Sequence, residues 1–334
     1  MKRYSVSALT WVFLSGVLCL QAMGQNSGLA ADRSFEVSEQ NRGIELSFRM
    51  QAGYLMGEAN EFVYDGGRTL SQLIWEINSL YMVGSGTTLK PCRWVSFQGD
   101  FLTMLADGDG TMDDYDWVYS GMEWSDWSHH EDTDVTKGTI IDVSVAVYPL
   151  QMLEKQQLSI SALLGYRIEN FEWEARGGTF VYSGNGFRDT TGAFTDYGYA
   201  EDQLGITYEQ LIYVPYVGVN LSYRLKDVEG GLRLIGSPFV SGEADDQHHL
   251  RDLETHAEWD GGSMFSVSGS IAYHIGDYVT LSTALNYTEY DTVTMDSTYT
   301  WTLSDGSEHE VVYEDTEGAN LQTMVASMSV SLNF

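Results

Sequence analysis

Apolar and polar residues alternate along most of the chain after about residue 45. In 45–57, large apolar residues occupy the even positions, and Ser, Arg, Gln and Gly occupy most of the odd ones. A period of two places the two sets on opposite faces of a β-strand. The same pattern predicts strands over 70–82, 95–101, 141–147, 158–166, 217–224, 232–240, 265–273, 279–290 and 320–334. An apolar face opposite Ser, Gln and charged residues is typical of a lipid-facing wall around a polar lumen. We therefore predict an all-β fold, a ten-stranded antiparallel transmembrane β-barrel.

The segments between these strands differ in length. Those over 84–93, 149–157, 225–230 and 274–278 are short, whereas the others are long and acidic. In outer-membrane barrels, short turns face the periplasm and long loops face the outside. The chain ends in alternating residues that finish with Phe334, a terminal aromatic in phase with the apolar face. The sequence thus predicts a barrel in the outer membrane of a Gram-negative bacterium, with its long loops facing outside.

The first 24 residues have the features of a signal peptide. Lys2 and Arg3 precede an apolar run over 6–20, and the small residues Ala22 and Gly24 offer a cleavage site. We predict a signal peptide over 1–24, a polar N-terminal segment over 25–44 and the barrel over 45–334. Cys92 would then be the only cysteine of the mature chain, which excludes an internal disulfide.

The net charge limits the classes of molecule that the protein is expected to bind. The formal net charge is −31, which is unsuited to nucleic acid and attracts cationic ligands. Acidic runs over 106–138 and 243–260 fall on the same predicted side of the barrel. Such runs are usually solvated surfaces, but two together can form a shared acidic mouth. We expect cationic ligands, contact with outer-membrane lipid, and a monomer.

Two short segments carry candidate catalytic chemistry. Asp114 and Asp116 are two residues apart, as are Asp246 and His248. Residues two apart on extended backbone project from one face. A His with an orienting Asp, facing a carboxylate pair, can hold and deprotonate a water molecule. In a chain with 48 acidic residues such pairs also arise by chance, so spacing alone leaves a solvated surface open.

The phase of the second pair is a difficulty. If Leu232, Leu234 and Val240 face lipid, strict alternation turns Asp246 and His248 outward too. A bulge near 236–238 or at 242 would correct the phase. The catalytic hypothesis requires such an irregularity.

Two other chemistries are less favoured. Ser128 lies near His130, but no nucleophile elbow and no suitably spaced acid accompany them. His129 and His130 beside Glu131 could bind zinc, but adjacent residues on a strand point to opposite faces. We therefore expect no metal.

Several motifs in order resemble one family, and together they span about 45–334. They are Trp-Ser-His-His-Glu-Asp-Thr at 127–133, the loop over 175–189, Gly-Gly-Arg at 66–68 with Ser-Gln-Leu at 71–73, and Pro-Tyr at 215–216 with Ser-Tyr-Arg at 222–224. These resemble the omptins, ten-stranded outer-membrane aspartyl endopeptidases. The resemblance implies a hydrolase in which water between an Asp pair and an Asp-His pair attacks the peptide carbonyl. It implies that the catalytic residues are Asp114, Asp116, Asp246 and His248.

The resemblance also implies substrate contacts. Glu61 matches a carboxylate that lines the site for the residue before the cut, which implies cleavage next to basic residues. The family's second acid there maps to Ala244, a departure that weakens the preference. We expect Met112, Glu243 and Asp245 to contribute to substrate binding as well.

Omptins generally need lipopolysaccharide as an activator, gripped by basic side chains on the outer wall. Asn170 and Leu211 stand where the family carries two such arginines, and Arg167 is expected to point into the lumen. We therefore expect no cofactor and a weakened dependence on lipopolysaccharide. The alternatives to a protease are a non-enzymatic adhesin or invasin, and a cation-selective pore, although ten strands leave little room for a pore.

Overall fold

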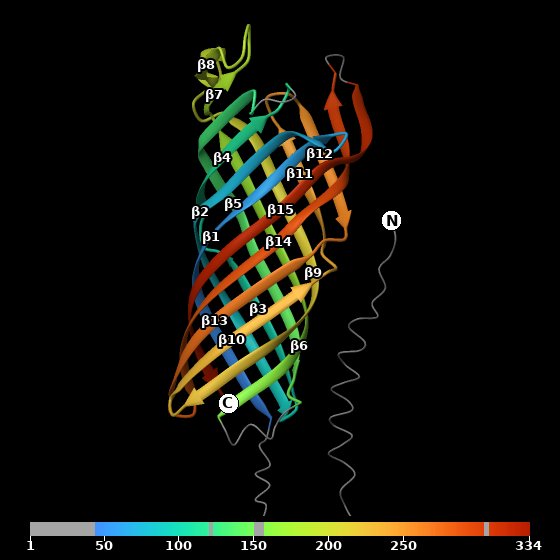
Figure 1. Cartoon of the computed structure of the whole chain (residues 1–334). Coiled ribbons are helices and arrows are strands. Elements are labelled where there is room, and N and C mark those ends of the chain that lie inside the picture. The colour runs from blue at the N-terminus through green and yellow to red at the C-terminus, as the bar shows by residue number, and fades with distance from the viewer. Residues whose placement is uncertain (1–43, 120–122, 150–156, 304–306) are drawn as a thin grey trace, which may run out of the picture.

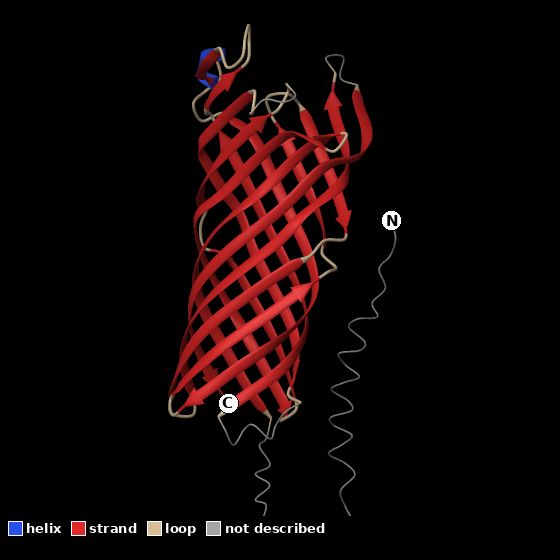
Figure 2. Ribbon diagram, viewed as in Figure 1, coloured by secondary structure: helices blue, strands red, loops and turns tan. Residues whose placement is uncertain are grey.

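The computed structural model describes residues 44–119, 123–149, 157–303 and 307–334. Nearly all of these residues lie in strands (Figures 1 and 2). The elements are β1 (Glu45–Asp65), β2 (Arg68–Cys92), β3 (Val95–Met104), β4 (Gly108–Asp116), β5 (Asp126–Val147), β6 (Leu158–Arg176), β7 (Thr179–Tyr182), β8 (Thr190–Ala193), the 3₁₀ helix η2 (Phe194–Tyr197), β9 (Leu204–Leu225), β10 (Val228–Ser237), β11 (Ser241–His248), β12 (Leu253–Asp260), β13 (Met264–Ile275), β14 (Val279–Thr302) and β15 (Glu308–Asn333). The predicted signal peptide and nearly all of the polar segment lie outside the described residues.

The strands pair antiparallel and close into a ring. β1 pairs with both β2 and β15, so the two ends of the barrel domain meet. Three positions in the ring are each filled by two strands in succession: β3 and β4 beside β2, β10 and β11 beside β9, and β13 and β12 beside β14. Within the described residues this gives ten positions, and β7 and β8 form a hairpin extending from β5. No helix in this part of the chain is long and apolar enough to cross a membrane.

The connections are shorter than predicted. β2 runs on to Cys92, so the first short connection is only the turn at Arg93 and Trp94. The acidic segments over 106–138 and 243–260, expected as loops, are mostly β4, β5, β11 and β12. The reason is that the strands continue past the apolar band and form a wall above it. In Figure 1 the C-terminal end lies at the bottom, and the β7–β8 hairpin lies at the top.

The two faces of the wall differ as the alternation predicts. Large apolar side chains point outward, for example Met50, Leu164 and Ile271, each more than 60% exposed. The lower lumen holds a cavity of about 400 Å³, lined mostly by polar residues such as Ser161 and Ser268. This confirms a lipid-facing exterior and a polar interior.

Extra residues in some strands reverse which positions face inward. On β2, Ile77 and Leu80 are both buried although they are three residues apart, and a register shift lies between them. Tyr290 and Val293 show the same change on β14. A one-residue slip exchanges the two faces of a strand. The positions that face the lumen within the membrane therefore do not predict which positions face it in the wall above.

An aromatic layer fills the lumen above the polar cavity. Trp75 stacks on Tyr208 with ring centroids 5.4 Å apart, and Trp173 lies 5.9 Å from the same ring. All three side chains are almost fully buried. Side chains therefore close the barrel at this level, which argues against the pore alternative.

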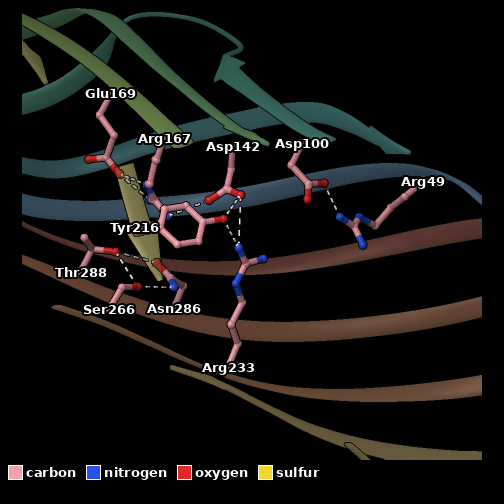
Figure 3. A network of polar contacts seen from close by, with 10 residues as sticks. All are labelled: Arg49, Asp100, Asp142, Arg167, Glu169, Tyr216, Arg233, Ser266, Asn286 and Thr288. Carbon is pink, nitrogen blue, oxygen red and sulfur yellow. Dashed lines mark hydrogen bonds and ion pairs between the residues drawn. The ribbon is translucent and has the colours of Figure 1, made fainter. Parts of the chain in front are cut away.

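A polar network lies below this layer (Figure 3). Asp142 accepts hydrogen bonds from the Tyr216 hydroxyl at 2.6 Å and from Arg233 at 3.2 Å. Arg167 points inward to Glu169 and Asp142, as its phase predicts. Each buried charge thus has a partner of opposite sign, which offsets the cost of removing it from water.

We predict that Gly165→Ala destabilises the barrel. Gly165 is the register partner of Tyr216, and an added Cβ would lie 2.3 Å from that ring. Overpacking of this kind costs typically about 1–3 kcal/mol, and displacing Tyr216 also weakens its bond to Asp142. The free energy of unfolding is measured by urea titration in detergent micelles. Gly269→Ala is the matched control, since no atom lies within 4 Å of that position's Cβ. Equal stability of the two variants would contradict this account.

Candidate active site

The two half-sites face the lumen from separate parts of the ring. Asp114 and Asp116 lie on the inner face of β4, between β2 and β5. Asp246 and His248 lie on the inner face of β11, between β9 and β12. Burial is the largest influence on the pKa of Asp114 and of Asp116; the charge of Asp246 also raises the pKa of Asp114, and a protonated His248 lowers that of Asp116. The four side chains are therefore in electrostatic contact across the lumen.

This site lies beyond the lipid-facing band. The outward positions next to these residues are polar: Asp113 and Tyr115 on β4, and Glu243, Asp245 and Gln247 on β11. A lipid-exposed wall would carry apolar residues there. The site therefore lies in the upper wall, at the end opposite the C-terminus.

The irregularity that the catalytic hypothesis required is present. Ser237 is buried at the end of β10, Phe239 is 70% exposed, and Val240 is buried again. The segment 238–240 belongs to neither strand and shifts the phase by one residue. Its backbone pairs with the matching break between β12 and β13. The Val240 N–H donates to the Gly262 carbonyl at 3.1 Å, and the Gly261 N–H donates to the Val240 carbonyl at 3.0 Å. This shift turns Asp246 and His248 inward.

The Asp114 and Asp116 pair holds a proton near neutral pH. Burial, followed by the charge of Asp116, raises the pKa of Asp114 to about 8. Burial also raises the pKa of Asp116. The Ser71 hydroxyl donates to Asp114 Oδ1 at 2.9 Å and opposes the rise. Two nearby carboxylates in a buried site resist double ionisation, so one acid and one base stand side by side.

The contacts of His248 define its tautomer. Nε2 lies 2.8 Å from Asp246 Oδ2, and Arg251 Nη2 lies 2.6 Å from Nδ1 and 3.2 Å from Nε2. Since a guanidinium can only donate, its shorter contact assigns Nδ1 as the acceptor, which leaves the ring proton on Nε2 facing Asp246. His248 is thus neutral and oriented by Asp246. Arg251 was missed from the sequence, although it is the only basic Lys or Arg residue in the acidic stretch 243–260.

Comparison with known proteins gives the family. A model of the omptin family matches residues 43–334. The chain belongs to the omptin family. It is 30% identical over 242 residues to the plasminogen activator of Yersinia pestis, covering 72% of this chain and 74% of that protein. It is also 30% identical over 237 residues to the outer membrane protease OmpP of Escherichia coli (strain K12), covering 69% and 73%.

A solved structure supports the fold. The crystal structure of the outer membrane protease OmpT from Escherichia coli matches with a TM-score of 0.79 at 22% identity, and the match covers 91% of this chain and 99% of that one. The predicted family, the antiparallel β-barrel and the location in a Gram-negative outer membrane are confirmed. This omptin is an outer-membrane protease.

The serine alternative has a contact but lacks an acid. Ser128 Oγ lies 3.4 Å from His130 Nε2, and both residues are buried. Burial lowers the pKa of His130 to about 4, and its Nδ1 has no hydrogen-bond partner among the described residues.

Tyr182, another residue missed from the sequence, lies close to the Asp pair: burial, then the charges of Asp114 and Asp116, raises its pKa to about 12.

The two adjacent histidines diverge, as their strand positions predict. His129 Nδ1 lies 2.9 Å from Asp113 on the outside of this omptin, whereas His130 is buried inside. No group of three or more His, Cys, Asp or Glu residues in the described ranges is placed to hold a metal ion.

The expected substrate residues separate into two groups. Glu61 faces inward, is 3% exposed, and accepts a hydrogen bond from Trp75 Nε1 at 3.4 Å. Met112 also faces inward but is fully buried in the core. Glu243 and Asp245 lie on the other face of β11 from Asp246, and Asp245 pairs outside with His256. Because alternation turns them away from the lumen, the expectation that Glu243 and Asp245 flank the substrate is corrected.

We predict that Ser71→Ala strengthens proton binding at Asp114. The hydrogen bond from Ser71 stabilises the ionised carboxylate of Asp114. Removing that bond should therefore raise the Asp114 pKa above about 8. A hydrogen bond to a charged group is worth about 1.5–3 kcal/mol, which corresponds to at least a roughly tenfold change in proton affinity. The carboxyl infrared band is titrated from acid to alkaline pH, with Asp114→Asn to identify it. An unchanged or lower midpoint would disprove the assignment of this hydrogen bond.

Proposed function

We propose that this omptin hydrolyses peptide bonds with a water molecule activated between the two half-sites, in a barrel mouth that faces outside. The observation that carries the proposal is the convergence of Asp114 and Asp116 with Asp246 and His248 on one lumen. Their chemistry is complementary, because one half offers a neutral imidazole and the other a carboxyl that shares a proton. General acid and general base are the groups that attack by water requires.

In the proposed mechanism His248 is the base. Its Nδ1 lone pair takes a proton as the water oxygen bonds to the peptide carbonyl carbon, so the water must displace Arg251 from Nδ1. Asp246 keeps Nε2–H in place and stabilises the imidazolium that forms. The protonated carboxyl of Asp114 donates a hydrogen bond to the carbonyl oxygen and keeps its proton, and Asp116 orients the water. The C–N bond then breaks and the amine leaves with the proton from His248. No covalent intermediate with the protein forms.

We predict a loss of turnover by orders of magnitude in each of four variants. These are His248→Ala, Asp246→Asn, Asp114→Asn and Asp116→Asn. Removing a positioned proton-transfer group costs about 10² to 10⁴ in rate. The kcat for a fluorogenic peptide is measured on refolded barrel, with the heat-dependent gel shift to verify folding. Ser128→Ala is the control and should retain most activity. Wild-type turnover in His248→Ala would refute the mechanism, and absence of cleavage by the wild type would favour the adhesin.

We further propose that cleavage is favoured next to basic residues. Glu61 is buried, and burial, followed by the charges of Asp246 and Glu317, raises its pKa well above the ordinary range. A cationic side chain would relieve this accumulation of negative charge. The acidic outer wall would attract such substrates, and salt would weaken that attraction beyond about 8 to 10 Å.

The outer wall supports a weak dependence on lipopolysaccharide. Asn170 and Leu211 are register partners on β6 and β9, so the two departures are side by side. Just above them, Lys137 is held by Glu172 at 3.0 Å and Glu209 at 2.7 Å. This patch lacks the free Arg fork that grips phosphate from two points. We propose that the patch binds lipid phosphate weakly.

We predict that activity requires little or no lipopolysaccharide. Refolded barrel in detergent is assayed with and without the lipid, and the two values of kcat/KM should agree within about threefold, since no phosphate clamp has to form. The double variant Asn170→Arg with Leu211→Arg should bind the lipid more tightly. Complete inactivity until lipid is added would show that other residues hold it.

A further inference from the structure

A second buried acid lies beside Glu61. Glu317 on β15 is the register partner of Val63 on β1, and Glu61 is the partner of Ala319. Glu61 and Glu317 are therefore diagonal neighbours on the same inward face. Each is only 3% exposed. Nothing in the alternation singled out Glu317, because the strand containing it was predicted to begin at residue 320.

The two acids have hydrogen-bond donors but no cation. Glu61 accepts from the Trp75 indole, and Glu317 accepts from the Tyr299 hydroxyl. Within the described ranges neither forms an ion pair, whereas the other buried acids there, Asp142, Glu169 and Asp246, each have a cationic or imidazole partner.

A third group points to a ligand at the same place. Asp246 is 6% exposed, and its Oδ1 has no hydrogen-bond partner among the described residues, although Oδ2 holds His248. Its charge raises the pKa of both Glu61 and Glu317, after the larger effect of burial. Glu61 and Glu317 therefore lie within electrostatic reach of Asp246, and within the described residues no cation pairs with either glutamate. Burying such groups unpaired is costly, and packing alone would be better served by Gln or Leu.

We propose that Glu317 and Glu61 together receive the positively charged side chain of the substrate residue next to the cut. This inference rests on the proposed function and names its second specificity residue. Ala244, where the family resemblance would place the second acid, is uncharged and buried on β11. Glu317 supplies the missing charge from β15 instead. The substrate class is peptides with a guanidinium or ammonium side chain.

The proposal implies proton release on binding. Burial raises the pKa of Glu317 to about 8, while the Tyr299 hydrogen bond lowers it and Asp246 raises it. The groups that face it are Tyr299 from β14, Glu61 from β1, Asp246 from β11 and Tyr208 from β9. An arriving cation stabilises the ionised form, so affinity for basic peptides should rise as the pH is raised through about 8. A neutral peptide should show no such rise.

The test compares two peptides that differ only in charge. One carries Arg before the cut, and the other carries citrulline, its neutral isostere. Glu317→Gln should lower kcat/KM for the Arg peptide by at least about 30-fold, the lower limit for losing one partner of a buried charge pair. The citrulline peptide should change by less than about threefold. Glu310→Gln, an exposed position on the same strand, is the matched control and should leave both values unchanged.

A variant that moves the acid from position 317 to position 244 separates a loss of charge from a loss of folding. Glu317→Ala should abolish the preference for Arg, and Ala244→Asp added to it should restore part of that preference. Equal loss on both peptides, or no loss on either, would overturn the proposal. The affinity of the two peptides is also measured by fluorescence anisotropy on His248→Ala and on His248→Ala with Glu317→Gln. If the barrel binds Arg over citrulline through Glu317 yet cuts neither, the proposed function fails and the specificity inference survives. Equal affinities would overturn the inference alone.

Discussion

Every function assigned to this barrel depends on which side of a one-residue-thick wall each side chain faces. Adjacent residues of a strand point to opposite sides, so one extra residue exchanges lipid-facing and lumen-facing sets. The break at 238–240 makes that exchange between β10 and β11, and it is held by backbone bonds to the break between β12 and β13. Without it, Asp246 and His248 would point outward. The orientation of the proposed catalytic half-site thus depends on an irregularity rather than on regular pleating.

The layers of the interior explain the electrostatics of the site. The aromatic layer of Trp75, Trp173 and Tyr208 separates the acids from the water-accessible cavity below. Acids above it are poorly solvated, and burial is the leading cause of each raised carboxyl pKa. Below it, charges are paired with opposite charges (Figure 3). The lower half of the barrel is therefore built for stability. In the upper half, Glu61 and Glu317 form no ion pair within the described residues, and we propose that the cationic side chain of a substrate neutralises them.

Much of this was predictable from the sequence, and the failures have a common cause. Alternation in segments such as 45–57 predicted the strands and their lipid face, because a bilayer tolerates only a continuous apolar wall. The motif pairs gave the four catalytic candidates. Alternation failed above the bilayer, where both faces are polar: Glu317 and Arg251 gave no periodic signal. Glu243 and Asp245 were placed at the substrate because they flank Ala244 in sequence, although their neighbour Asp246 faces the other way.

The claim that water is the nucleophile can be tested most directly in the pre-steady state. Enzyme and a saturating Arg peptide are mixed, quenched in acid at times shorter than one turnover, and the intact protein is weighed by mass spectrometry. The account predicts an unmodified protein mass at every time point. A transient mass increase equal to the acyl half of the peptide, on Ser128 or any other residue, would contradict it.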